Sequence, residues 1–212
     1  MDRIKLKTLA KEQIKGNILF LFLCMFLIVV VVVGVSVLVP IFGAIAVNVI
    51  TPALSIGLLS VYFGLSRGVK PGVEGLFSAM PIFLKALFLQ IVTAIFVVLW
   101  TMLLIVPGII KGISYMFAPY LLAENHDIGV MEAIDQSKKL TNGHKMELFV
   151  LTLSFFPWML LISVTFGIAA VYVIPYMQMT LVNAFNELKG EPQLIPAAKT
   201  EEEADYDWSR EN

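Results

Sequence analysis

The sequence is poor in the residues that soluble enzymes use for chemistry. Among 212 residues it has one cysteine, Cys24, and two histidines, His126 and His144. A single cysteine excludes an intrachain disulfide and leaves no thiol pair for redox or zinc chemistry. The two histidines lack the spacing of a zinc motif such as H-E-x-x-H. We therefore expect no metal site and assign no cofactor.

Catalytic motifs are also missing. The sequence contains no phosphate-binding loop, no G-x-S-x-G nucleophile motif and no dinucleotide-binding fingerprint. A membrane enzyme could use only the polar cluster from Glu124 to Asp127, together with His144, and only if folding brought these groups within hydrogen-bonding distance. We expect a protein that is not an enzyme.

Charged residues are scarce and apolar residues abundant. Only 15% of the residues are charged, 58% are hydrophobic, and the mean hydropathy is +0.86. A spanning helix needs about 20 apolar residues, and the first apolar run is too long for a secretory signal peptide. We predict an all-α polytopic membrane protein with six transmembrane helices, at about 18–39, 42–66, 82–106, 109–123, 148–165 and 168–188.

Prolines mark two places along these spans. Pro107 and Gly108 are predicted to form the turn between the third and fourth spans. Pro157 and Trp158 are predicted to interrupt the fifth span.

Three short amphipathic segments separate the apolar runs. Residues 1–17 alternate basic and apolar side chains, as a helix lying on an anionic membrane surface would. A second segment, 73–80, is too short to span and presents Leu76, Phe77 and Met80 as candidates for interfacial contact. Residues 124–146 form the third.

These segments divide a membrane domain of residues 1–188 into three hairpin units, at about 1–66, 67–123 and 124–188. Each unit has a surface segment followed by two spans, which suggests an internal repeat. The alternative interpretation is that unrelated membrane hairpins simply look alike. Residues 189–212 are acidic, and we expect a disordered cytoplasmic tail.

The positive charges predict the orientation. Lysine and arginine are retained on the cytoplasmic side of a membrane, and with both termini inside, 13 of the 15 basic residues fall there. Lys85 lies at the inner edge, and only Lys111 is on the outer side. We therefore expect both termini to be cytoplasmic.

Five polar residues inside the predicted spans are the candidates for a functional cavity, because polar groups are costly in lipid. They are Asn48, Gln90, Lys111, Gln178 and Asn183. Two interpretations stay open. The amides could join helices through hydrogen bonds while Lys111 extends outward, or the set could line one intramembrane cavity.

One stretch carries a family resemblance. It reads V-P-G-I-I-K-G-I-S-Y-M-F-A-P-Y-L-L-A-E-N at 106–125, and E-A-I-D-Q-S-K-K-L, G-H-K-M-E-L-F and P-Y follow it. The sequence resembles, over about 1–190, the bacterial family catalogued as domain of unknown function 975. That family is distantly similar to the membrane domain of some glycerophosphodiester phosphodiesterases. The resemblance implies a six-helix membrane domain and brings no catalytic residues.

The sequence thus predicts a non-enzymatic integral protein of the bacterial plasma membrane. We expect it to interact with membrane lipids, and with another membrane protein or itself, and not with nucleic acid. The alternative is a transporter or channel-like protein for a small amphiphilic solute. The basic segment at 1–17 fits a lipid surface better than a nucleic acid because a span follows it directly.

Overall fold

The computed structural model describes residues 2–38, 43–69 and 72–190. Of the predicted acidic tail, 189–212, the part from residue 191 onward lies outside these residues. Every regular element within the described residues is helical. The helices are α1 (Arg3–Ile14), α2 (Ile18–Leu38), α3 (Gly43–Ser66), η1 (Val73–Phe77), η2 (Met80–Ile82), α4 (Phe83–Leu103), α5 (Ile105–Tyr115), α6 (Ala118–Glu124), α7 (Val130–Thr141), α8 (Lys145–Leu153), α9 (Phe156–Val164) and α10 (Ala170–Lys189).

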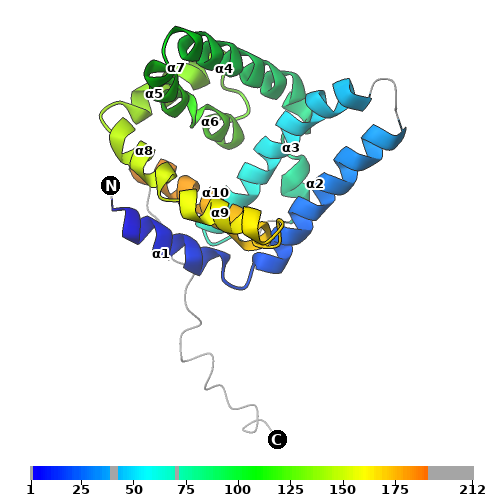
Figure 1. Cartoon of the computed structure of the whole chain (residues 1–212). Helices are drawn as coiled ribbons and strands as arrows, with labels where there is room; N and C mark the ends of the chain where they lie inside the picture. The colour runs from blue at the N-terminus through cyan, green and yellow to red at the C-terminus, as the bar shows by residue number, and fades with distance from the viewer. Residues whose placement is uncertain (1, 39–42, 70–71, 191–212) are drawn as a thin grey trace, which may run out of the picture.

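The helices divide into an outer and a central set. Figure 1 shows α4 across the top, α2 along the right, α8 at the left and α9 below the centre, with α3 and α6 between them and α10 behind α9. In the most apolar stretch of α2 only 11% of residues are buried, against 61% in α3. An apolar helix that stays exposed on one side suits a lipid environment, so the outer helices have the character of membrane-facing helices.

Five stretches are long and apolar enough to cross a membrane, which confirms an all-α polytopic membrane protein. They are Ile18–Val37, Ala46–Ser66, Val73–Leu103, Val106–Glu124 and Lys145–Val164. The sixth predicted span forms a helix, α10, but is not among them. This helix carries Gln178, Asn183 and Asn186, which lower its hydropathy, and about half of it is buried in protein.

The predicted position of the turn between the third and fourth spans is wrong by three residues. The chain reverses at Leu104, whose extended backbone (φ −162°, ψ 140°) separates α4 from α5. Pro107 and Gly108 instead lie in the first turns of α5, where a proline needs no N–H partner. A Cβ on Gly108 would lie 2.3 Å from Oγ1 of Thr101. Gly108 therefore lets α5 pack closely against α4 rather than forming the turn.

The fourth and fifth predicted spans are each broken in two. The first break, at Met116 and Phe117, separates α5 from α6, and the second, at Ser154 and Phe155, separates α8 from α9. A proline follows each break, at Pro119 and Pro157, within the first two positions of the next helix. Proline begins a helix well but interrupts one that would run through it, so each of these stretches consists of two helices rather than one continuous α-helix. The interruption near Pro157 was predicted, and the one before Pro119 was not.

The basic N-terminal segment is helical as predicted, but its apolar side does not face lipid. That side of α1, which includes Leu6, Ala10 and Ile14, is fully buried and packs against α10. The predicted surface helix is thus a packed part of the protein, with its lysines on the remaining side. Burial against protein explains why Gln13, a polar residue on the same stripe, is also buried.

The second amphipathic segment is shorter and more buried than predicted. Residues 73–80 do not form a two-turn α-helix but two short 3₁₀ helices, η1 and η2. Leu76 is buried at 1% exposure because η1 packs against α3 at Gly57. A Cβ on Gly57 would lie 1.9 Å from the Leu76 carbonyl oxygen. Only a glycine fits this contact without movement of the backbone.

Gly57→Ala tests that contact. The added methyl group has no space against the backbone of η1, so we expect a loss of about 1–3 kcal/mol in the free energy of unfolding, as for other overpacked sites. The measurement is thermal unfolding of the purified protein in detergent. Gly34→Ala in α2 is the matched control, because a Cβ there meets nothing within 4 Å. Equal stability of the two variants would contradict the close approach of α3 and η1.

Candidate functional site

The five polar residues of the predicted cavity have different surroundings. Asn48 is exposed on α3, and Gln90 is exposed on α4. Lys111 is half-buried, and its Nζ lies 4.7 Å from the centre of the Trp100 ring, a cation–π contact within the α4–α5 hairpin. The Lys111 side chain thus contacts Trp100, whereas one of the two interpretations above has it extend outward toward the lipid head groups.

The two polar residues on α10 each join another helix. Gln178 Oε1 accepts a hydrogen bond from the Tyr120 hydroxyl at 3.1 Å. Asn183 is fully buried, and its Nδ2 donates to Gln13 Oε1 at 2.7 Å, which ties α10 to α1. These contacts agree with the interpretation that amides join helices. The shared cavity stays a prediction.

The three candidates for interfacial contact also differ in exposure. Leu76 is buried, whereas Phe77 is 39% exposed and Met80 is half-buried. Phe77 is therefore the member of this group that presents most surface to its surroundings. Whether it touches lipid or a partner stays a prediction.

An ion cluster that sequence reasoning missed joins the ends of three central helices. Glu124, the last residue of α6, accepts hydrogen bonds from Arg67 Nη2 at 2.8 Å, next to the end of α3, and from Lys189 Nζ at 2.6 Å, at the end of α10. The Glu124 side chain is only 17% exposed. A carboxylate shared by two cations is stabilised by both and fixes the relative positions of the three helices.

An aromatic triangle lies one helical turn before the ion cluster. Its ring centres are 6.2 Å apart for Phe63 and Tyr120, 5.4 Å for Phe63 and Phe185, and 5.8 Å for Tyr120 and Phe185. Each aromatic residue stands four positions before one member of the ion cluster in the sequence. The rings therefore fill the space between α3, α6 and α10 directly beneath the charges.

The polar cluster that could have served a membrane enzyme has other partners. Glu124 belongs to the ion cluster, while His144 Nδ1 lies 2.9 Å from Glu147 Oε2. Lys85 donates to the backbone carbonyl of His126 at 2.9 Å. Within the part of the chain that the structure describes, no three His, Cys, Asp or Glu side chains lie close enough to hold a metal ion.

The first helix break is stabilised by a serine from α7. Ser137 Oγ donates to the Ser114 carbonyl at 2.8 Å and accepts from the Phe117 N–H at 3.2 Å. Ser137 is fully buried. A buried break leaves backbone groups without helical partners, and this hydroxyl satisfies one group on each side of it. The segment predicted as a polar connector is thus a structural support of the fourth span.

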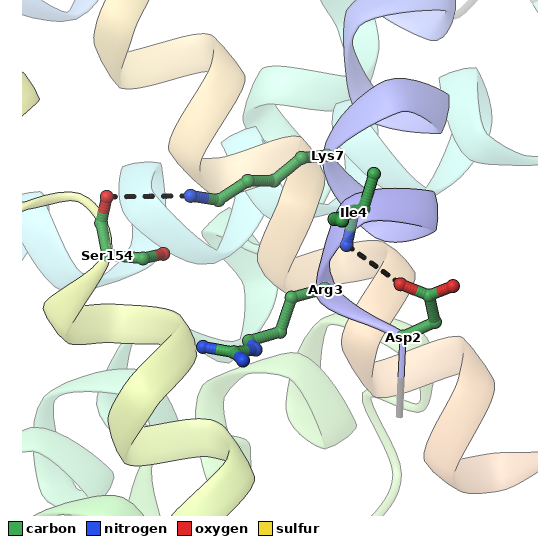
Figure 2. A pocket seen from close by; sticks show the side chains of 5 residues that line it. All are labelled: Asp2, Arg3, Ile4, Lys7 and Ser154. Carbon is green, nitrogen blue, oxygen red and sulfur yellow. Dashed lines mark hydrogen bonds between the residues drawn. The ribbon is translucent and has the colours of Figure 1, made fainter.

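The second break lies beside the basic helix α1. Lys7 Nζ lies 3.5 Å from the Ser154 carbonyl oxygen and 4.5 Å from the centre of the Phe155 ring. Figure 2 shows Arg3 and Lys7 extending from α1 toward the chain at Ser154. With Asp2 and Ile4 they line an open pocket of ≈ 700 Å³. Burial and the nearby charges of Arg3 and Lys11 lower the pKa of Lys7.

The region from the end of α4 through α10 also decides the family comparison. Residues 102–191 match the family described as "Protein of unknown function (DUF975)". The DUF975 resemblance is confirmed over this stretch. The match covers the first helix break, Glu124 and Lys189, but not Arg67 or α1. The family description assigns no activity, and the match does not extend the likeness to glycerophosphodiester phosphodiesterases.

No curated protein and no solved structure gives a significant match to this chain. Function must therefore be inferred from the contacts within the DUF975 region and the helices around it.

Glu124→Gln tests the role of the ion cluster at the edge of the DUF975 region. The amide keeps the shape of the side chain but removes its charge, so Arg67 and Lys189 lose a shared partner. We expect a loss of about 1–2 kcal/mol in the free energy of unfolding, less than for a fully buried pair because both cations are partly exposed. Thermal unfolding in detergent measures it.

Asp135→Asn provides the control, since it removes one carboxylate from an exposed pair with Lys138. We expect a smaller change in unfolding temperature for this variant. Added salt should weaken the exposed pair more than the Glu124 cluster. If the two variants unfolded at the same temperature, Glu124 would not hold the three helices together.

Proposed function

We propose that this protein is a non-enzymatic integral protein of the bacterial plasma membrane that acts by contacting membrane lipids or a membrane-protein partner. The observation that carries this proposal is that polar side chains lie between the helices while apolar side chains cover the outer helices. Polar side chains such as Asn183, Gln178 and Ser137 are engaged with other helices, while the outer helices display apolar side chains. The apolar sides of the outer helices therefore form the surface that lipids or a partner would contact.

The outer surface supports the lipid part of the proposal. Exposed apolar residues continue along α2, α4 and α9, where Val37, Met102 and Val164 are 70%, 81% and 75% exposed. Isolated apolar residues are ordinary on a soluble protein, but continuous apolar sides on several helices need a membrane or a partner. Solute transport gains no comparable support, because Asn48 and Gln90 lie exposed on different helices.

We further propose that the three hairpin units are related repeats. Phe63, Tyr120 and Phe185 occupy corresponding places, each four residues before a member of the ion cluster. The surface segments follow a cyclic order that supports this proposal. η1 of the second unit packs on α3 of the first, α7 of the third on α5 and α6 of the second, and α1 of the first on α10 of the third.

A purified sample tests the contact function. The full-length protein is extracted from its native membrane, and the lipids and proteins that copurify are identified by mass spectrometry. We expect retained lipids or a specific partner, and we expect Phe77→Ser to reduce at least one of them because Phe77 is the exposed member of its segment. A wild-type protein that retains neither lipid nor partner would contradict the proposal.

Both termini are proposed to be cytoplasmic, with α10 as a sixth crossing. This topology can be tested by cysteine labelling, because Cys24→Ala removes the single native thiol. New cysteines at Lys5, Asn142 and Ile168, all exposed, are then treated with an impermeant maleimide. Only Ile168→Cys, between α9 and α10, should react in intact cells, since the other two lie on the inner side of the proposed topology.

Permeabilised cells are the control, in which all three cysteines should react. Reaction of Lys5→Cys in intact cells would show that the N-terminus lies outside, opposite to the proposed orientation. Reaction of Asn142→Cys with Ile168→Cys would instead show that the spans between them do not separate the two sides.

A further inference from the structure

The pocket beside α1 is made by residues far apart in the sequence. Arg3 and Lys7 come from the N-terminal helix, and Ser154 comes from the break between α8 and α9. α1 is held in place by its buried apolar side and by the hydrogen bond from Asn183 to Gln13. The cations are therefore presented from a fixed helix toward a fixed break rather than from a free terminus.

The charges in this pocket are unbalanced. Asp2 is the one carboxylate among the described residues that line it, and Oδ1 of Asp2 accepts hydrogen bonds from the backbone N–H groups of Ile4 and Lys5 at 2.9 and 3.3 Å, as the N-cap of α1. Lys7 has a weak contact with the Ser154 carbonyl, and its pKa is lowered by burial and by repulsion from two further cations, Arg3 and Lys11. An anion placed between Arg3 and Lys7 would relieve this repulsion.

Apolar residues are exposed in this pocket and next to Ser154 in the sequence. Ile4 lines the pocket and is 79% exposed. Leu153 and Phe156, which stand on either side of Ser154 in the sequence, are 54% and 57% exposed. A soluble anion gains nothing from these apolar side chains. An anion that carries hydrocarbon chains gains both the charge contacts and the apolar contacts.

We propose that this pocket binds the phosphate group of an anionic phospholipid, with Arg3 and Lys7 contacting the phosphate and the acyl chains lying along Ile4, Leu153 and Phe156. This proposal rests on the proposed function of contacting membrane lipids, and it specifies an anionic phospholipid as the ligand. It also gives the break between α8 and α9 a role, because the interruption brings the backbone at Ser154 beside Lys7. Arginine and lysine are the usual partners of phosphate in proteins.

The experiment compares two charge-matched double variants of the full-length protein. Arg3→Gln with Lys7→Met removes both pocket cations, and methionine keeps an unbranched side chain beside Phe155. Lys5→Met with Lys15→Gln removes two exposed charges of the same segment outside the pocket. Each protein is placed in phosphatidylcholine nanodiscs that contain phosphatidylglycerol, and bound phosphatidylglycerol is measured by native mass spectrometry.

We expect the pocket variant to lose roughly tenfold in apparent affinity for phosphatidylglycerol, because two charge-assisted contacts are removed. The control variant should bind like the wild type. Equal losses in both would show that the overall charge of α1 attracts the lipid, and no loss in either would show that the pocket does not bind it. Either result overturns the site.

Two further arms separate the alternatives. Lys7→Arg keeps the charge and should retain binding, whereas a loss in this variant together with a lower unfolding temperature would show a structural role. Inorganic phosphate should not displace phosphatidylglycerol, and if it did the site would be one for free phosphate. If the wild type bound no lipid and no partner, the proposed function itself would fail, while lipid bound equally by wild type and pocket variant would remove only this site.

Discussion

The need to satisfy every backbone polar group without water governs this structure. In a bilayer a break in a helix leaves carbonyl and N–H groups that lipid cannot serve. The fourth and fifth predicted spans are both broken, and at each break a side chain from a short helix elsewhere in the chain approaches the freed backbone. Ser137 of α7 serves the first, and Lys7 of α1 lies beside the second. The short helices are therefore necessary parts of the spans that they touch.

The same logic explains the central helices. α10 is the one predicted span that is not apolar enough to be a candidate crossing by composition, yet its polar groups contact α1, α3 and α6 through Gln13, Ser66 and Tyr120. At the ends of α3, α6 and α10 a single carboxylate, Glu124, meets two cations above a layer of three aromatic rings. Charge is thus gathered at one end of the central helices, and the space below it is filled by rings.

The sequence predicts helix type and approximate extent well, because long apolar runs have few alternatives. The helices at 18–38, 43–66 and 83–103 begin or end within three residues of the predicted spans. Of the two breaks, only the one near Pro157 was predicted, although Pro119 is an equal signal. Whether a proline interrupts a span depends on partners elsewhere in the chain, such as Ser137, which the local sequence does not reveal. Leu104 gave no signal of a turn.

The candidate site was less predictable for a related reason. Arg67, Glu124 and Lys189 are far apart in the sequence, and each alone looks like an ordinary charge at the end of a span. Only the packing of α3, α6 and α10 brings them together. Asn48 and Gln90 stand out in the sequence because they interrupt apolar runs, and such an interruption reflects local composition rather than the surroundings of the side chain in the fold. The Arg3 and Lys7 pocket was recognisable only as a basic helix.

The packing of α1 on α10 has a consequence for biogenesis. α1 rests on α10, which is synthesised much later, and the hydrogen bond between Gln13 and Asn183 joins positions 170 residues apart. Until α10 is in the membrane, the apolar stripe of α1 has no protein to cover it and can be sheltered only by the lipid surface. Packing of α1 therefore waits until α10 has been synthesised, and a chain truncated before α10 would leave α1 without this partner.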